Sequence, residues 1–181
     1  MSSEVWLVTG AQASGKSTVA ELLARQFDRA VHIHGGQFYR WAVRGWAHFD
    51  DEDREAASQH LQLRYRLSAT VATEYARAGF TAVVQDNIYG HDVVNWLHSL
   101  TDLPRHLVVL RPPIATVVAR HEERRQRTGK IAYRGSYTPE QNDAAVALTP
   151  STLGLWLDTS GQRPDETVKE ILARASEAEV D

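Results

Sequence analysis

Apolar and polar residues follow two different rhythms along the chain, and these predict strands alternating with helices. Apolar residues recur at intervals of three and four in 18–27, 54–78, 92–100, 114–127, 139–148 and 164–172, as in amphipathic helices. Short apolar runs of strand length occupy 5–9, 30–34, 80–86, 106–110 and 153–158. This alternation predicts an α/β fold, a parallel sheet with helices on both faces and the first strand near its centre.

Polar and glycine-rich stretches mark the ends of these elements. The acidic run 50–53 precedes the long helix 54–78 and is predicted to cap it, with Mg²⁺ binding as the alternative. The stretch 128–136 has two glycines and no apolar periodicity, so we predict a loop. The polar tail 175–181 is predicted to be frayed. No linker or repeat divides the chain, which predicts a single domain over 1–181.

The loop between the first strand and the first helix has the spacing of a phosphate-binding P-loop. Residues 10–17 read Gly-Ala-Gln-Ala-Ser-Gly-Lys-Ser, directly after an apolar run and directly before an amphipathic segment. Glycines let the backbone N–H groups approach phosphate oxygens, and the helix points its positive end at the same place. We expect Lys16 to reach the β- and γ-phosphates and the Ser17 hydroxyl to bind Mg²⁺. The predicted ATP-binding residues here are Gly10, Ala13, Ser14, Gly15, Lys16, Ser17 and Thr18.

Composition and charge narrow the classes of partner. The chain has 181 residues, with 20 Lys or Arg against 23 Asp or Glu, and its net charge of −3 argues against nucleic acid or an anionic membrane. It contains no cysteine, which excludes disulfides, thiolate catalysis and cysteine–metal sites. There is no apolar run of membrane-spanning length, and the start of the chain shows no signal-peptide pattern. These features predict a cytoplasmic protein that acts on a small molecule.

Two titratable residues at strand ends are candidates for the chemistry. Asp86 ends the third strand, at the edge of the sheet where α/β proteins bind ligands. It is expected to hold Mg²⁺ through water, or to take or orient the proton of an acceptor hydroxyl; capping the next loop is the structural alternative. His34 ends the second strand and is the other candidate base, because its ordinary pKa lies near neutrality. A structural role is the alternative for His34 as well.

The helical segment 114–127 ends in a cluster of arginines. Arg120 and Arg124 lie four residues apart and share a helix face, with Arg127 close to that face. We predict that these side chains cover the charge that develops on a transferred phosphoryl group. The alternative is a solvated basic helix end, which the helix dipole would favour.

Aromatic residues are concentrated in 38–46 and recur after the third strand. Part of this set shares one helix face, so packing in the core is one interpretation. The other is an aromatic wall for a partly apolar acceptor that bears a hydroxyl group. The predicted acceptor residues are Gln37, Tyr39, Trp41 and Tyr89.

With these motifs in place, the chain resembles the small P-loop kinases, and among them the chloramphenicol phosphotransferase-like group of AAA-family phosphotransferases. Besides the P-loop, the resemblance includes the segments 85–90, 120–129 and 154–168. It implies a three-layer fold with five strands in the order 2-3-1-4-5 and a small lid at about 120–137. It also implies that the adenine of ATP lies near Arg111 and Thr159.

The resemblance implies transfer of the γ-phosphate of ATP, with Mg²⁺, to a hydroxyl of a small molecule such as an antibiotic, a nucleoside or a sugar derivative. The chain departs from the group at one position: members usually have an aspartate after the second strand, where Gly36 or Gln37 stands here. The group's usual base therefore has no counterpart. One alternative is a nucleoside or nucleotide kinase that binds a monophosphate through Arg40, Arg44 and Arg64. The other is a nucleotide-binding regulatory module without transfer activity.

Overall fold

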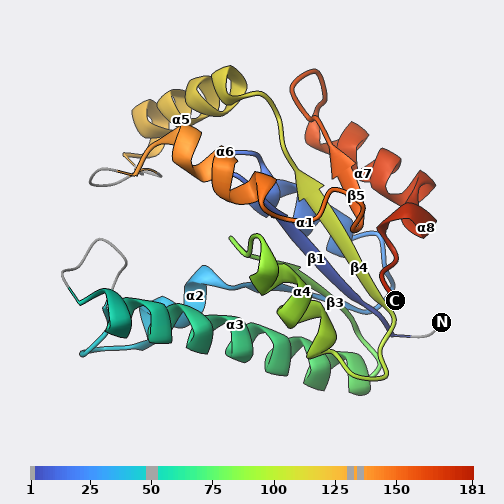
Figure 1. Ribbon diagram of the computed structural model, residues 1–181. Helices are drawn as coiled ribbons and strands as arrows, with labels where there is room; N and C mark the ends of the chain where they lie inside the picture. The colour runs from blue at the N-terminus through green and yellow to red at the C-terminus, as the bar shows by residue number, and fades with distance from the viewer. Residues whose placement is uncertain (1–2, 48–52, 130–132, 134–136) are drawn as a thin grey trace.

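The computed structural model describes residues 3–47, 53–129, 133 and 137–181, and it shows three layers: a central sheet with helices on each side (Figure 1). Five parallel strands lie in the order β2-β3-β1-β4-β5. The strands are β1 (Val5–Gly10), β2 (Ala30–His34), β3 (Thr81–Gln85), β4 (Arg105–Leu110) and β5 (Leu155–Leu157). This order confirms the one implied by the family resemblance, and it puts the strand before the P-loop at the centre.

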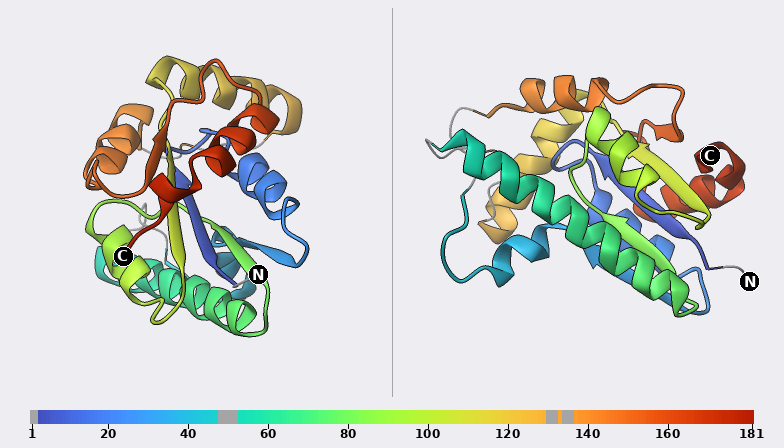
Figure 2. Two further views of the ribbon diagram at one scale, coloured as in Figure 1. Left: turned by 90° about the vertical axis from the view of Figure 1, so that its right-hand side faces the viewer. Right: turned by 60° about the horizontal axis from the view of Figure 1, so that its bottom comes forward.

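Helices cover both faces of the sheet (Figures 1 and 2). Neighbouring residues of β1 point to opposite faces, so Leu7 joins one apolar core and Val8 joins the other. One core includes residues of α2 (Gly36–Trp41), α3 (Arg54–Arg77), α4 (His91–His98), α5 (Ile114–Thr128) and α6 (Pro139–Ala147). The other includes residues of α1 (Lys16–Ala24), α7 (Pro164–Ala173) and α8 (Ala175–Ala178). No helix in the described ranges combines the length and apolarity needed to cross a membrane.

The helix ends follow the polar signals of the sequence. Asp53 caps α3 by accepting a hydrogen bond from the Ala56 N–H at 2.9 Å, which confirms the predicted cap for this residue. The rest of the acidic run, 50–52, lies outside the described residues. At α6, Thr138 and Gln141 form a reciprocal capping box. Gly129 ends α5 with a φ of 68°, a left-handed conformation that suits glycine.

The C-terminal tail is ordered, so the prediction of a frayed end is wrong. Ala178 of α8 is fully buried, and the Val180 N–H donates to the Arg105 carbonyl at 2.9 Å. Glu179 also forms an antiparallel bridge with His106. The reason lies in the short strand β5, which pairs only with residues 108–110 of β4. The backbone groups at the start of β4 are therefore available to the tail, whatever the polarity of its side chains.

Candidate phosphate-binding and phosphoryl-transfer site

The P-loop begins where β1 ends and leads directly into α1. Gly10 has a φ of 137°, and a side chain there would collide with the backbone of Leu110, so this position requires glycine. Ala13 and Gly15 have left-handed φ values of 66° and 101°. Turns of this kind arrange successive backbone N–H groups into a concave site for anions. The local geometry is therefore that of a phosphate-binding loop.

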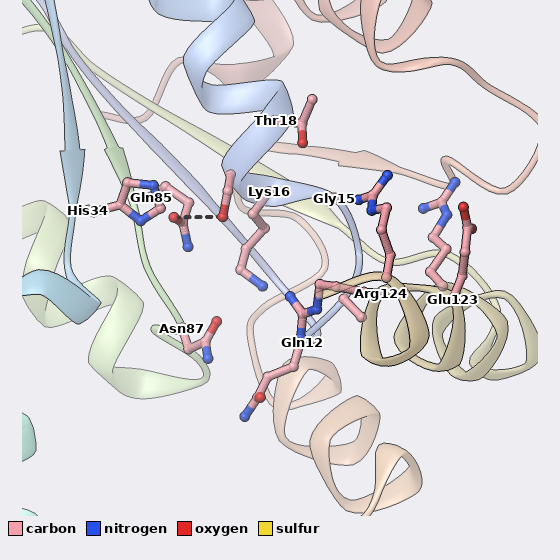
Figure 3. Close-up of a pocket in the computed structure, with 13 residues that line it drawn as sticks. Gln12, Gly15, Lys16, Thr18, His34, Gln85, Asn87, Glu123 and Arg124 are labelled. Carbon is pink, nitrogen blue, oxygen red and sulfur yellow. Dashed lines mark hydrogen bonds between the residues drawn. The ribbon is translucent and has the colours of Figure 1, made fainter. Parts of the chain in front are cut away.

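A cavity of about 590 Å³ lies against this loop (Figure 3). Its walls come from the P-loop, from α1, from the ends of β2 and β3, and from α5. The lining residues are Gln12, Ala13, Gly15, Lys16, Ser17, Thr18, His34, Gln85, Asn87, Arg120, Glu123, Arg124 and Arg127. The volume is in the range of small-molecule and cofactor sites. Predicted phosphate-binding residues, lid arginines and one of the candidate bases thus meet in one place.

Lys16 is buried, and its ammonium group is held by the loop itself. Nζ donates to the carbonyl oxygens of Gly10 and Ala11 at 2.7 and 2.6 Å. Burial, followed by the nearby positive charges of Arg124 and Arg64, lowers the pKa of Lys16 to about 7. A phosphate group bound in the cavity would supply the negative charge that this environment lacks.

Two arginines of α5 have different surroundings. The guanidinium of Arg120 donates to the Ser14 carbonyl at 3.1 Å and to the Thr159 carbonyl at 2.6 Å, which fastens α5 to the P-loop. Arg124 lies one turn further on and lines the cavity, and its buried Nε has no hydrogen-bond partner in the described part of the chain. A buried donor without a partner costs about 1–3 kcal/mol, so an anion in the cavity would stabilise Arg124. Of the predicted lid 120–137, residues 130–132 and 134–136 lie outside the described residues.

Two amide side chains and the imidazole of His34 form the part of the wall that faces these arginines. Figure 3 shows His34, Gln85 and Asn87 on one side of Lys16, with Arg124 on the other. His34 and Gln85 are register partners at the ends of β2 and β3. Sequence reasoning did not single out Gln85 or Asn87 as site residues. Their place at the carboxyl end of the third strand was the available signal, since α/β sheets bind ligands there.

Asp86 points away from the cavity. Its carboxylate is fully buried and forms an ion pair with Arg64 of α3, whose Nε lies 3.0 Å from Oδ2. Gly35 packs so closely against this carboxylate that a side chain at position 35 would collide with it. Gln85, not Asp86, faces Ser17, because neighbouring strand residues point to opposite faces. The structure does not bring Asp86 to the metal or the acceptor, and those two roles stay predictions.

Three of the predicted acceptor residues belong to α2. Gln37 is exposed, Trp41 is 65% exposed, and neither lines the cavity in the described structure. Tyr39 packs edge-on against Trp46, with the Arg64 guanidinium 4.7 Å from its ring centre. Their role as walls of an acceptor site stays a prediction. Arg64, which the nucleotide-kinase alternative assigned to a monophosphate, is already engaged by Asp86.

Three further predicted residues join neighbouring elements. The Tyr89 hydroxyl donates to the Gly10 carbonyl at 3.0 Å, and so it supports the P-loop from behind. Arg111 forms two hydrogen bonds of 2.8 Å with Asp143 of α6. Thr159 is buried beside the P-loop. An adenine near Arg111 and Thr159 stays a prediction.

The donors beside Ser17 decide whether the site fits Mg²⁺. Mg²⁺ prefers oxygen ligands and usually keeps several waters. The Ser17 hydroxyl donates to Oε1 of Gln85 at 3.1 Å, so two oxygen donors stand together at the cavity wall. Within the described ranges, no group of three or more His, Cys, Asp or Glu side chains is arranged to hold a metal. The donors fit a metal that arrives with nucleotide phosphates, and Ser17 and Gln85 would hold it on the protein side.

Replacing Gln85 by glutamate is expected to strengthen the dependence of nucleotide binding on Mg²⁺. The new carboxylate would stand beside Ser17, and the Mg²⁺ concentration that gives half-maximal ADP binding should fall about three- to tenfold. The measurement is a Mg²⁺ titration of ADP binding by calorimetry. Gln26→Glu adds the same charge in the turn after α1 and serves as the matched control. Equal Mg²⁺ dependence of ADP binding in both variants would show that Gln85 is not next to the metal.

Fold and site together define a P-loop nucleotide-binding domain of the small-kinase type. Residues 5–141 match the AAA domain family, and the chain belongs to this family. The match confirms the resemblance carried by the sequence motifs. No curated protein sequence matches the chain.

Solved structures share this fold at low sequence identity. A tunicamycin resistance protein from Deinococcus radiodurans has a TM-score of 0.65 at 14% identity, over 99% of each chain. A sugar kinase from a Janibacter species has a TM-score of 0.63 at 19% identity, over 97% of this chain and 96% of that one. Shikimate kinase from Aquifex aeolicus has a TM-score of 0.60 at 14% identity, over 95% and 96%. These likenesses show a kinase-like fold.

Proposed function

We propose that this protein is an ATP-dependent phosphotransferase that acts in the cytoplasm and moves the γ-phosphate to a hydroxyl group of a small molecule. One observation carries the proposal: a single cavity joins the P-loop and Lys16 to the lid arginines on one side and to His34, Gln85 and Asn87 on the other (Figure 3). The three solved structures compared above are described as a sugar kinase, a shikimate kinase and a tunicamycin resistance protein. They support a small-molecule acceptor and include an antibiotic among the candidates.

Phosphoryl transfer depends mainly on positioning and on neutralising charge. Bound Mg²⁺ would neutralise part of the phosphate charge at Ser17. Lys16 and Arg124 are placed to neutralise the rest, because both are cationic groups at the cavity without an anionic partner in the described structure. Arg120, already bound to Ser14 and Thr159, acts by fixing the position of α5.

His34 is the side chain that we assign as the proton acceptor. Its neighbours on the same wall, Gln85 and Asn87, carry amides that do not take up a proton near neutral pH. The carboxylate of Glu123 belongs to α5, on the side of the arginines (Figure 3). The His32 ring lies 4.6 Å from that of His34, and burial together with His34 lowers the pKa of His32 to about 4. His32 is therefore neutral at physiological pH and adds no charge next to the proton acceptor.

The proposal is tested by incubating the protein with ATP, Mg²⁺ and a pool of hydroxylated antibiotics, nucleosides and sugars. Mass spectrometry then identifies any compound that gains one phosphate. A single phosphorylated product would establish the activity and the acceptor. If nothing in a broad pool gains phosphate while ATP binds normally, transfer is excluded for these acceptors and the regulatory module is favoured.

Replacing His34 by glutamine is expected to lower kcat about 10²–10⁴-fold, the usual contribution of general base catalysis. Nucleotide affinity should stay within about twofold of wild type, because the Gln side chain leaves the P-loop and its cations unchanged. Initial rates with the identified acceptor measure kcat, and calorimetry measures ADP binding. His98→Gln, at the exposed end of α4, is the matched control. A His34→Gln variant with wild-type kcat would remove His34 from the chemistry.

A further inference from the structure

Side chains from distant parts of the sequence hold the backbone of the P-loop. The Gln12 carbonyl accepts a hydrogen bond from the Tyr133 hydroxyl at 2.8 Å, across 121 positions. The Gln12 N–H donates to Oδ1 of Asn142 at 2.7 Å, across 130 positions. Neither Tyr133 nor Asn142 lines the cavity in the described structure. These contacts therefore constrain the loop from outside the nucleotide site.

The Tyr133 contact determines where a phosphate-binding N–H points. A peptide group is planar and trans, so its C=O and its N–H point in opposite directions. Turning the Gln12 carbonyl towards Tyr133 turns the Ala13 N–H the other way, and Ala13 lines the cavity. Arg120 donates to the Ser14 carbonyl in the same manner. This contact fixes the direction of the Gly15 N–H, which belongs to the same peptide group. Tyr133, from outside the cavity, and Arg120, from its wall, thus each fix the orientation of one peptide group of the loop.

The conformation of Ala13 makes such a constraint necessary. Its φ of 66° is left-handed, a conformation that residues with a Cβ adopt at an energetic cost. Asn142 can oppose this cost because it is fixed itself: it is fully buried, and its amide donates to the Tyr137 hydroxyl at 3.1 Å. Without these contacts the peptide between Gln12 and Ala13 would be free to rotate towards a more favourable conformation.

We propose that Tyr133 and Asn142 are positioning residues that set the nucleotide affinity of the P-loop without touching the nucleotide. They do so by holding Gln12, and through it the left-handed turn at Ala13. The inference goes beyond the proposed function and rests on it only for the identity of the ligand. It assigns part of the binding free energy of the nucleotide to a contact between the lid segment and the loop.

The test is the replacement of Tyr133 by phenylalanine, which removes one hydroxyl and keeps the ring. Affinities for Mg²⁺-ADP and for pyrophosphate, measured by calorimetry, should fall about three- to tenfold, the worth of one hydrogen bond. The unfolding temperature should fall by no more than about 4 °C, the shift that the loss of about 1 kcal/mol causes in a chain of this size. Tyr75→Phe is the matched control, because Tyr75 is 42% exposed on α3, away from the cavity. Wild-type affinity in Tyr133→Phe would overturn the proposal.

A second substitution separates positioning from a general loss of stability. Glycine adopts left-handed φ values without the cost that alanine bears. Ala13→Gly introduced into Tyr133→Phe should therefore recover a large part of the lost ADP affinity. A double variant that binds as weakly as Tyr133→Phe would overturn the proposed route through Ala13.

The outcome is independent of phosphoryl transfer. Absence of a phosphorylated product, with the expected pattern of ADP affinities, would remove the proposed function and leave this inference in place. A wild-type protein that binds neither ADP nor pyrophosphate would overturn both.

Discussion

Replacement of Lys16 by methionine is expected to weaken nucleotide binding at least about 100-fold and at the same time to stabilise the fold. The ammonium group is buried, and burial together with Arg124 and Arg64 lowers its pKa to about 7. Methionine fills similar space without a charge that must be desolvated. The two carbonyls that bind Lys16 keep other donors, since Gly10 is bonded by the Tyr89 hydroxyl and Ala11 by a backbone N–H. We expect a gain of about 2 kcal/mol, or about 5 °C in unfolding temperature, near neutral pH.

The gain in stability should depend on pH in a defined direction. The pKa of Lys16 is lower in the folded protein, about 7, than its ordinary value of 10.5, so the unfolded chain binds more protons between these values. The stability of the wild type therefore rises with pH across this window through Lys16. The advantage of Lys16→Met should be largest below about pH 7 and should shrink towards pH 10. Thermal unfolding at several pH values measures this advantage, with Lys169→Met as the matched control, because Lys169 is exposed on α7.

Nucleotide affinity should also depend on the protonation of Lys16, but in the opposite direction to stability. Phosphate oxygens favour the charged ammonium, so binding raises the pKa of Lys16, and nucleotide affinity should fall as pH rises above about 7. Calorimetry at about pH 8 in buffers of different ionisation enthalpy should show proton uptake on ADP binding. Lys16→Met should lose at least about 100-fold in affinity and show no such uptake from this site. A variant that is less stable than wild type and binds ADP with wild-type affinity would contradict both parts of the prediction.

The P-loop and the layered fold could be predicted because both depend on local sequence. The spacing of Gly10, Gly15 and Lys16 between a strand and a helix is specific by itself. Apolar periodicity located the strands and most helices, and the family resemblance supplied their order. The order of the C-terminal tail was not predicted, because it depends on backbone groups of β4 that the short strand β5 leaves unpaired. No local sequence pattern reveals such unpaired groups.

The sequence could not predict which residue at the end of the third strand faces the cavity. Asp86 was the obvious candidate because it is a carboxylate at a strand end, but a shift of one residue reverses the face of the sheet. Gln85 therefore meets Ser17, and Asp86 meets Arg64. The contacts of Tyr133 and Asn142 with Gln12 were equally hidden, because their partners lie more than 100 positions away along the chain.

Separating Arg64 from Asp86 is expected to cause the largest loss of stability. Arg64→Met leaves a fully buried carboxylate without its counter-ion, which typically costs about 3–5 kcal/mol and would lower the unfolding temperature by about 10 °C. Asp86→Asn leaves the guanidinium unpaired and should cost a similar amount. The double variant should cost clearly less than the sum, because a neutral pair has no buried charge to compensate. Arg25→Met, which breaks an ion pair exposed on α1, should cost less than about 1 kcal/mol.

The Asp86→Asn variant also tests whether Asp86 has a direct role in the chemistry. If Asp86 acts only by holding Arg64 and the Gly35 turn, the folded Asp86→Asn variant should need the same Mg²⁺ concentration for ADP binding as the wild type. The Mg²⁺ titration used for Gln85→Glu measures this at a temperature where Asp86→Asn is fully folded. A higher Mg²⁺ requirement in Asp86→Asn, without any change in Gln85→Glu, would support the sequence-based prediction that Asp86 holds the metal. The opposite pattern would place it at Ser17 and Gln85, on the face of the sheet that carries the cavity.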